Sequence, residues 1–311
     1  MLSKDEIQAV VQAATLYYHD HINQQQIAEK LHTTRQTVSK LLRNAEQLGI
    51  VEFRINNPLE LLNDLGEKLQ VLFGLQKALV VPCGFDEPDL VASALAPYAG
   101  EYLLVLMAQG LKRIGLSWGR TLYRSLSSVP LSHFEDTLVY PLVGSSNRTA
   151  KYFMINDMVR RLSIQLNSAS AYAYIPADPG NDSMLFKRTA VYESIKSLWE
   201  TTDLAIVGIG VNPRDEVEQR AAYPGEPSNR YPKDAAVGDL LTHYFDSSGA
   251  FLEAASEILC ASVEDLRHTR RVLAVAGGRE KTAAILGALK TGLLTDLVTD
   301  EQTCRRLLSN V

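Results

Sequence analysis

Four short segments combine glycine with hydroxyl or basic side chains, the residue types that bind small anions. They span residues 115–122 (GLSWGRTL), 143–149 (VGSSNRT), 207–210 (VGIG) and 276–281 (AGGREK). Glycine lets a ligand approach the backbone closely, and the N–H groups at the start of a helix favour negative charge. Each segment alone fits a plain tight turn equally well. Together, the four predict a site for a small anionic ligand that carries hydroxyl groups.

Residues for other kinds of chemistry are scattered along the chain. No nucleotide-binding glycine loop, HExxH zinc motif or GxSxG nucleophile motif occurs in the sequence. His133, His243 and His268 are isolated, so surface or packing roles are favoured over catalysis. Asp203 and Asp239 fit either acids of sugar chemistry or residues that cap elements and bind hydroxyls. We therefore expect no catalytic residue, no metal ion and no cofactor.

A second set of side chains is suited to reading DNA. From Lys30 to Arg43 the chain carries four basic residues and no acid. Arginine and lysine pair with guanine, glutamine pairs with adenine, and serine or threonine contacts phosphates or thymine methyl groups. The alternative is a solvent-exposed helix face with no partner, which the packing pattern around it disfavours. The predicted DNA contacts are Gln24, Gln25, Thr34, Arg35, Gln36, Thr37, Ser39, Lys40 and Arg43.

Three helices are needed to present these side chains. Apolar residues at helical spacing predict a first helix over about 4–19. Asn23 is a suitable N-cap for a short second helix over 24–31. A third helix is expected over 35–47, with Gly49 ending it.

The small residue Ala28 allows two of these helices to cross closely, which a helix-turn-helix requires. His32 stands where the turn usually has glycine, and histidine tolerates a left-handed conformation at a cost. Residues 49–55 alternate like a short strand, which predicts a winged variant of the motif.

Beyond residue 75, strands and helices alternate. Apolar runs typical of strands occupy 78–81, 113–117, 138–143, 171–175, 204–209, 272–276 and 297–298. Helical patterns occupy 89–109, 151–166, 184–199 and 280–291. This order predicts an α/β, Rossmann-like fold with a doubly wound, mostly parallel sheet. Ligands bind such sheets at the carboxyl ends of the strands, where the four anion-binding segments fall.

The boundary between the two domains is expected at the sequence Asn56-Asn57-Pro58. It is expected to separate a helix-turn-helix DNA-binding domain, 1–57, from an α/β ligand-binding domain, 58–311, to which the family resemblance given below assigns sugar-effector binding and oligomerisation. Just beyond it, Leu62, Leu65, Leu69 and Leu72 step by three and four residues. These leucines fit either packing on their own domain or a coiled-coil seam between two copies.

Composition narrows the class of protein. With 311 residues, 46% hydrophobic and 22% charged, the chain is an ordinary folded protein of about two domains. A net charge of −5 excludes a general nucleic-acid or membrane coat. Three scattered cysteines indicate neither disulfides nor a zinc site. No run approaches the ~18 apolar residues that span a membrane, so a cytoplasmic protein is expected.

The order of these motifs resembles the SorC family of sugar-responsive bacterial transcription regulators over nearly the whole chain. The similarity rests on segments of both domains. They are Tyr17-Tyr18-His19-Asp20, Gln25-Gln26-Ile27-Ala28, Thr37-Val38-Ser39, Gly115 to Leu122, Ala236-Val237-Gly238-Asp239, Tyr244-Phe245-Asp246 and Ala276-Gly277-Gly278 with Lys281. The resemblance implies an effector domain similar to sugar-phosphate isomerases and deaminases, which binds a sugar or sugar phosphate without turnover. It also implies homodimers or tetramers on paired operators, acting as repressors.

Site roles follow from the same resemblance. The family's phosphate-binding turn falls on Gly119, Arg120 and Thr121, its acid for sugar hydroxyls on Asp239, and its phosphate-neutralising lysine on Lys281. The loop of Gly144, Ser145 and Ser146 should close over the ligand. Some members carry a lysine just before this glycine that forms a Schiff base, but Val143 stands here, so no covalent effector is expected.

Two alternatives remain open. The chain fits, less well, an isomerase- or deaminase-like enzyme of sugar phosphates with an N-terminal appendage, although no acid and base pair accompanies the anion-binding turns. A winged domain that binds a protein partner instead of DNA is the other alternative.

Overall fold

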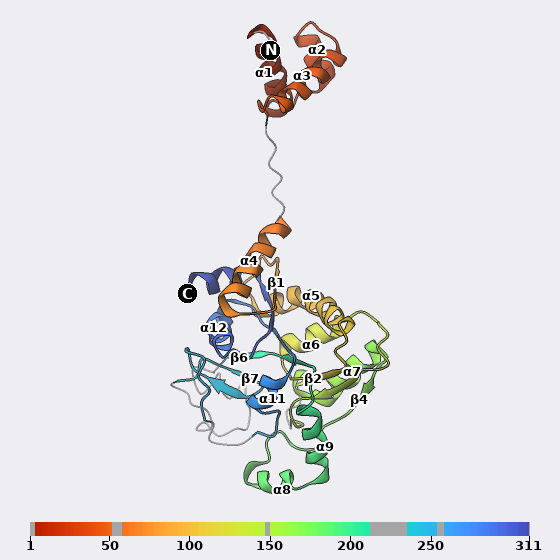
Figure 1. Ribbon diagram of the computed structural model, residues 1–311, viewed down its shortest axis with the longest axis vertical. Helices are drawn as coiled ribbons and strands as arrows, with labels where there is room; N and C mark the ends of the chain where they lie inside the picture. The colour runs from red at the N-terminus through yellow and green to blue at the C-terminus, as the bar shows by residue number, and fades with distance from the viewer. Residues whose placement is uncertain (1–3, 52–57, 147–149, 212–234, 254–257, 311) are drawn as a thin grey trace. The chain divides into compact units, whose positions relative to one another are not determined.

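The structure is a computed structural model that describes residues 4–51, 58–146, 150–211, 235–253 and 258–310. The chain divides into an N-terminal unit, Met1–Asn57, and a C-terminal unit, Pro58–Val311. Figure 1 shows the helices of the first unit and, in the second, a sheet with surrounding helices.

The N-terminal unit holds the three expected helices. They are α1 (Lys4–Ala14), continued by a π-helical turn (Thr15–His19), then α2 (Gln24–Lys30) and α3 (Arg35–Gln47). Ile27, Ala28 and Val38 are buried where α2 and α3 meet, which confirms the predicted helix-turn-helix packing. The side chain of Asn23 accepts hydrogen bonds from the N–H groups of Gln25 and Gln26, as an N-cap does.

The turn between α2 and α3 explains the unusual residues in it. His32 adopts φ 48°, the left-handed conformation that the missing glycine would provide. Thr34 caps α3 by accepting a hydrogen bond from the N–H of Thr37 at 3.2 Å. The predicted wing lies largely outside the described residues, since Ile50 and Val51 form bends and 52–55 follow them.

The C-terminal unit is built on a seven-stranded sheet. Its strands are β1 (Lys77–Val81), β2 (Arg113–Leu116), β3 (Leu138–Pro141), β4 (Ala169–Ser170), β5 (Leu204–Val207), β9 (Arg271–Val275) and β10 (Asp296–Asp300). They lie in the order β1-β10-β9-β5-β2-β3-β4, and every neighbouring pair is parallel. This confirms the predicted doubly wound sheet and aligns the carboxyl ends of its strands along one edge.

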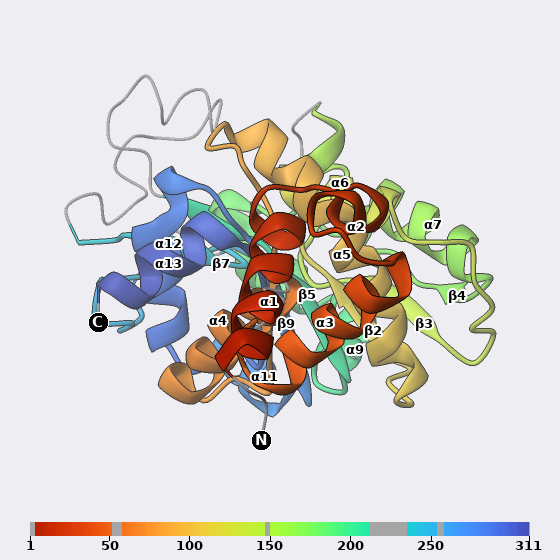
Figure 2. The ribbon, with the colours of Figure 1, turned by 90° about the horizontal axis from the view of Figure 1, so that it is seen from above.

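Helices cover both faces of this sheet. They are α4 (Pro58–Phe73), α5 (Pro88–Ala108), α6 (Arg120–Ser127), α7 (Ile155–Leu166), α8 (Ser183–Lys187), α9 (Ala190–Trp199), α11 (Val263–His268), α12 (Thr282–Lys290) and α13 (Glu301–Ser309), with short 3-10 turns at Lys151–Phe153, Gly180–Asp182 and Arg279–Lys281. Figures 1 and 2 show α5, α6 and α7 together on one side and α4, α12 and α13 on the other. Right-handed crossovers in both directions from the centre of the sheet produce this two-sided cover.

Two strand assignments differ from the prediction. The strand expected over 171–175 is wrong, because β4 ends at Ser170. The chain continues as an irregular segment, in which the carbonyl of Ile175 accepts a hydrogen bond from the N–H of Ser145. A second, antiparallel sheet was not predicted. It contains β6 (Ile209–Val211), β7 (Gly238–Leu240) and β8 (His243–Phe245). Strands of three residues are too short to produce a readable alternation.

The leucines of α4 pack within their own unit. Leu62, Leu65 and Leu69 are buried against β1 and α13, whereas Leu72 is 43% exposed. The interpretation as packing on the same domain is therefore confirmed for the first three leucines.

One helix corrects the expectation about apolar runs. Within the described residues, α5 is long and apolar enough to cross a membrane by length and composition alone. Leu95, Leu103 and Leu106 are nevertheless buried in the core, and half of the helix is covered by the rest of the unit. Burial among neighbouring elements explains its apolar composition, as in the core helix of a large sheet.

A buried ion pair joins β9 and β10 at the edge opposite the carboxyl ends. The guanidinium of Arg271 donates to Asp296, which has no exposed surface, with one N–O distance of 2.7 Å. The hydroxyl of Tyr102 donates to the same carboxylate at 2.6 Å. The bond to Asp296 raises the pKa of Arg271, which keeps the pair charged.

We expect this pair to be necessary for the stability of the C-terminal unit. Asp296→Ala leaves the Arg271 guanidinium without its partner and should lower the free energy of unfolding by about 3–5 kcal/mol. Urea unfolding followed by tryptophan fluorescence measures it, because both tryptophans lie in this unit. The exposed pair of Lys196 and Glu200 provides the control: Lys196→Ala should leave the midpoint unchanged. Equal losses in the two variants would contradict the prediction.

Candidate functional site

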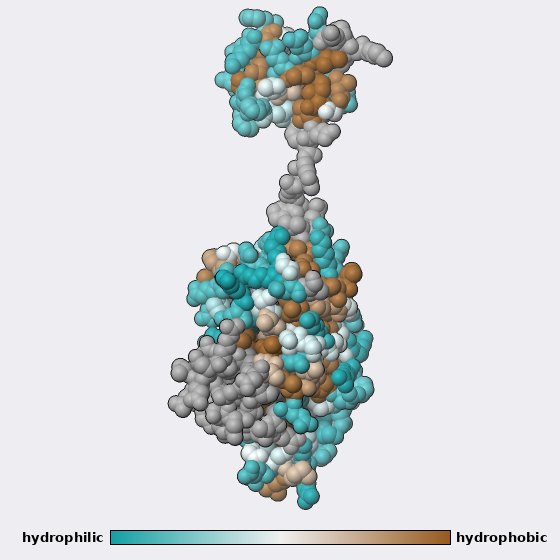
Figure 3. All heavy atoms as spheres, turned by 90° about the vertical axis from the view of Figure 1, so that its left-hand side faces the viewer, coloured by the Kyte–Doolittle hydropathy of each residue, from teal (hydrophilic) through white to brown (hydrophobic). Residues whose placement is uncertain are grey.

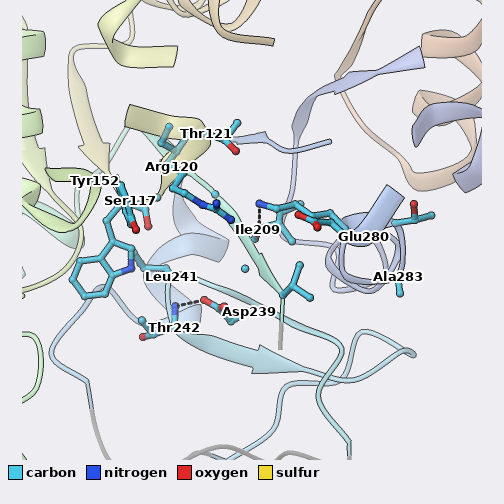
Figure 4. A pocket seen from close by; sticks show the side chains of 18 of the residues that line it. Ser117, Arg120, Thr121, Tyr152, Ile209, Asp239, Leu241, Thr242, Glu280 and Ala283 are labelled. Atoms are coloured by element: carbon cyan, nitrogen blue, oxygen red, sulfur yellow. Dashed lines mark hydrogen bonds between the residues drawn. The ribbon is translucent and has the colours of Figure 1, made fainter. Parts of the chain in front are cut away.

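A pocket of about 1300 Å³ opens at the carboxyl ends of β2, β5 and β9. Figure 4 shows side chains from the turns after these strands pointing into it. Five of the predicted ligand residues line it: Gly119, Arg120, Thr121, Asp239 and Lys281. Because these residues are far apart in the sequence, their convergence comes from the strand order and not from local structure.

The turn after β2 presents a helix start to the pocket. Gly119 adopts φ 140° and is the N-cap of α6, a conformation that L-residues with a side chain rarely adopt. Arg120 and Thr121 are the first residues of α6, and the N–H groups of a first helical turn have no partner inside the helix. The partial positive charge of this turn therefore adds to that of the Arg120 side chain.

Lys281 reaches the same pocket from the turn after β9. Its ammonium donates to the carbonyl oxygen of Ile209 at 3.0 Å, which is the dashed line at Ile209 in Figure 4. Burial, with the neighbouring positive charge of Arg120, lowers the pKa of Lys281. Within the described ranges, neither Arg120 nor Lys281 is hydrogen-bonded to a carboxylate. Two basic groups thus face one pocket and repel each other there.

The carboxylate of Asp239 lies against β6 on the other wall. A Cβ atom at Gly210 would stand 1.9 Å from Oδ1 of Asp239, so only glycine at this position leaves room for the carboxylate. The N–H of Thr242 donates to Oδ2 at 3.0 Å. Leu241 and Thr242 form the turn between β7 and β8 with φ values of 49° and 69°, which is costly for residues with a side chain.

The remaining predicted ligand residues do not line this pocket. Gly144 packs against the backbone of Pro176 and donates its N–H to the carbonyl of Leu259. The hydroxyl of Ser145 donates to the carbonyl of Ala173 at 2.7 Å. Ser146 follows in the same segment, and 147–149 lie outside the described residues. In this structure the loop therefore serves packing, and its closure over a ligand stays a prediction.

Aromatic residues of the pocket were missed by the sequence analysis. The rings of Trp118 and Phe153 meet edge to face at 5.7 Å, and Tyr152 lies beside them. Trp118 belongs to the glycine-containing segment 115–122, but nothing in the sequence links it to residues 152–153. An aromatic wall next to a polar site is typical of sugar binding, since the faces of sugar rings are apolar.

The other candidate residues take the structural roles that the sequence favoured. The carboxylate of Asp203 accepts hydrogen bonds from the N–H groups of Lys112 and Arg113, which holds the start of β2. His133 and His268 are exposed beside glutamates. His243, the first residue of β8, is half-buried, and its Nε2 lies 2.8 Å from the carbonyl oxygen of Ala261. Burial opposes its charged form, but Cys260 and that carbonyl raise the pKa of His243 to about 9.

The candidate DNA interface is the outer face of α3 with the start of α2. Most of the nine predicted side chains are exposed, and Gln24 and Ser39 are partly buried. The hydroxyls of Thr34 and Thr37 lie 2.9 Å apart and serve the cap of α3. The predicted residues thus lie at the start of α2 and along α3, mostly at the surface, with no acidic side chain on α3 before Glu46.

Known proteins match both units. The Sugar-bind family model matches residues 57–309, and a MarR family model matches residues 14–57. The deoxyribonucleoside regulator of Bacillus subtilis is 27% identical, covering 100% of each chain. The transcriptional regulator LsrR of an Enterobacter species is 31% identical over 99% of this chain and 95% of its own.

A solved structure extends the similarity to the fold. The full-length sorbitol operon regulator SorC of Klebsiella pneumoniae has a TM-score of 0.72 and 28% identity, covering 98% of this chain and 100% of its own. The fold, the pocket and these matches define a transcriptional regulator with a helix-turn-helix and a sugar-binding effector domain. The chain belongs to the SorC family.

Gly210 gives a direct test of the pocket geometry. Gly210→Ala forces the carboxylate of Asp239 away from β6 and should lower the free energy of unfolding by about 1–3 kcal/mol, as overpacking does. Gly208→Ala is a matched control, because its Cβ would meet only ordinary contacts of 3.5 Å or more. Thermal unfolding of the two variants measures the difference. Similar midpoints would show that Asp239 is not held as the structure has it.

Proposed function

We propose that this regulator represses a carbohydrate catabolic operon and responds to a phosphorylated sugar bound between Arg120, Lys281 and Asp239. The observation that carries the proposal is the pair of basic side chains, Arg120 and Lys281, that face the pocket with no hydrogen bond to a carboxylate among the described residues. A phosphate group between Arg120 and Lys281 relieves their repulsion and meets the first turn of α6.

The rest of the pocket suits the sugar itself. The Asp239 carboxylate has lone pairs that accept hydrogen bonds from sugar hydroxyls, and Trp118 offers an apolar face for the ring. Val143 is buried and carries no amine, so we propose reversible binding without a covalent bond. The Gly144–Ser146 loop is proposed to close over the occupied site.

We propose that the effector is bound and not converted. Reversible binding needs only complementary charge and shape, whereas isomerisation needs an acid and a base at the reacting carbons. We assign the Asp239 carboxylate to the hydroxyl groups of the sugar, a binding role that needs no proton transfer. Incubation with sugar phosphates tests the enzyme alternative, because any conversion of substrate would favour it.

We assign DNA binding to residues 1–57 and effector binding with oligomerisation to 58–311, in a cytoplasmic protein. Repressors commonly place two recognition helices on paired half-sites, which requires at least a homodimer. Exposed apolar side chains on the N-terminal unit support further contacts between copies, in addition to those assigned to 58–311. Ile7, Val11, Leu48 and Ile50 are each at least 36% exposed, and Figure 3 shows a broad hydrophobic area on this unit. Dimers or tetramers are proposed on this basis.

Effector control needs a ligand that prefers one of two states of the assembly. A difference of about 1–3 kcal/mol in effector affinity between the DNA-bound and released states gives a 5- to 150-fold change in operator affinity. The repulsion between Arg120 and Lys281 contributes such a difference if only one state lets both contact the ligand.

The candidate DNA interface on α3 can be tested by substitution. Arg35→Ala or Gln36→Ala should lower specific operator affinity by about 1–3 kcal/mol, because each removes a pairing with a base edge. Gln47→Ala, at the far end of α3, is the control and should bind as the wild type does. A mobility-shift titration at fixed salt measures the three variants. Equal operator binding by all three variants would exclude this surface of α3 as the DNA-binding site.

The second functional prediction concerns Lys281 and the proposed phosphate site. A thermal-shift screen of free and phosphorylated pentoses, hexoses and polyols identifies the effector, because a true ligand stabilises the fold by mass action. Lys281→Ala should then lose most of the shift with phosphorylated sugars but keep operator binding. Lys290→Ala, on the exposed end of α12, should respond like the wild type. An unchanged shift in Lys281→Ala would reject the assigned phosphate site.

A further inference from the structure

Asp300 is buried at the carboxyl end of β10, and no basic side chain within the described residues forms an ion pair with it. Its Oδ1 accepts a hydrogen bond from the Thr303 N–H at 2.8 Å. Its Oδ2 accepts from the Thr303 hydroxyl at 2.7 Å and from the Gly278 N–H at 2.9 Å. The same N–H lies 2.8 Å from the Thr303 hydroxyl. We name these three residues the β10 clasp.

The β10 clasp holds the loop that carries Lys281. Gly278 adopts φ 102° and is the N-cap of the turn Arg279–Lys281, so its position sets where Lys281 begins. A Cβ atom on the preceding Gly277 would stand 2.3 Å from Oδ2 of Asp300. A buried carboxylate is costly unless it is well hydrogen-bonded, and here the bonds are made to the loop and to the first turn of α13.

The helix α13 leaves the clasp and packs on α4. Asp300 is the N-cap of α13, and Thr303, Cys304 and Leu307 form its buried face. The thiol of Cys304 lies 3.7 Å from the carbonyl oxygen of Leu65 in α4. The helix α4 begins at residue 58, directly after the N-terminal unit in the sequence. One rigid helix therefore contacts both the Lys281 loop and the helix through which the chain continues to the DNA-binding unit.

The far end of α13 also reaches the pocket. Arg306 forms an ion pair with Asp86 at 2.8 Å, and both Asp86 and Asn310 line the pocket. A ligand thus meets elements tied to both ends of α13. Packed helices move as units and do not deform smoothly, so a shift at the ends is passed to the buried face.

We propose that the β10 clasp and α13 couple the effector pocket to α4, with Asp300 and Thr303 as positioning residues for the Lys281 loop. The inference rests on the proposed effector site. When an anion occupies the pocket, Gly278 is held more firmly, the clasp orders the first turn of α13, and α13 steadies α4. A bound ligand then stabilises α4, at the start of the C-terminal unit, without contacting it.

Hydrogen exchange of the full chain tests the coupling, because it reports local opening segment by segment. Inorganic phosphate serves as the probe, against chloride at equal ionic strength. In the wild type, phosphate should slow exchange about threefold or more both at 277–281 and in α4 over 62–70. Thr303→Val should keep the first effect and lose the second, and Thr303→Ser should restore it.

Thr299→Val is the matched control. Thr299 is buried on β10, and its hydroxyl has no hydrogen-bond partner within the described residues, so the same substitution leaves the clasp intact. It should behave as the wild type does. If Thr303→Val folds poorly, Cys304→Ala cuts the contact with α4 instead and should also lose only the α4 response. An α4 response that survives in both variants, or that is absent in the wild type while 277–281 respond, would overturn the coupling.

The design separates failure of the coupling from failure of the proposed effector site. If phosphate slows exchange in neither segment, the anion site is rejected. The clasp is then judged without ligand. Thr303→Val, but not Thr299→Val, should speed exchange at 277–281 and at 62–70 together. Faster exchange confined to α13 would overturn the coupling even then.

Discussion

The placement of two like charges in one pocket is the constraint around which the C-terminal unit is arranged. Arg120 and Lys281 come from opposite sides of the sheet centre and face each other without a carboxylate bonded to either, within the described residues. Burial and the neighbouring charge of Arg120 lower the pKa of Lys281, so its charged form is less favourable in the folded chain than in water. A bound anion would favour the charged forms of both side chains, which is what the proposed effector site requires.

The sheet topology is what brings these residues together. Parallel strands bring their carboxyl ends to one edge, so the turns after β2, β5 and β9 meet although they lie far apart in the sequence. The small antiparallel sheet then adds Asp239 to the opposite wall. Gly210 makes this possible, because its missing side chain is the space that the carboxylate occupies.

The elements that depend on local sequence patterns could be predicted from the sequence. The helices of the N-terminal unit follow from caps and apolar spacing, and the ends of α3 agree with the expected 35–47. The strands of the main sheet follow from buried apolar runs. The β6–β8 sheet and the aromatic pair of Trp118 and Phe153 could not be found this way, because short strands and long-range contacts leave no periodic signal. The glycine of the Gly144 turn makes a close backbone contact with Pro176, and the closure of this loop over a ligand stays a prediction.

The position of the pocket also bears on why such a domain suits regulation. A ligand that only fills a rigid cavity changes nothing elsewhere, because it has no preference between two states. In the proposed effector site, Lys281 is carried by a loop, and the buried carboxylate of Asp300 bonds that loop to the first turn of α13. In the mechanism that we propose, an anion that neutralises the repulsion between Arg120 and Lys281 stabilises this loop in one arrangement. Because α13 packs on α4, we propose that this preference also stabilises α4. Ligand binding then affects the helix that directly follows the DNA-binding unit in the sequence.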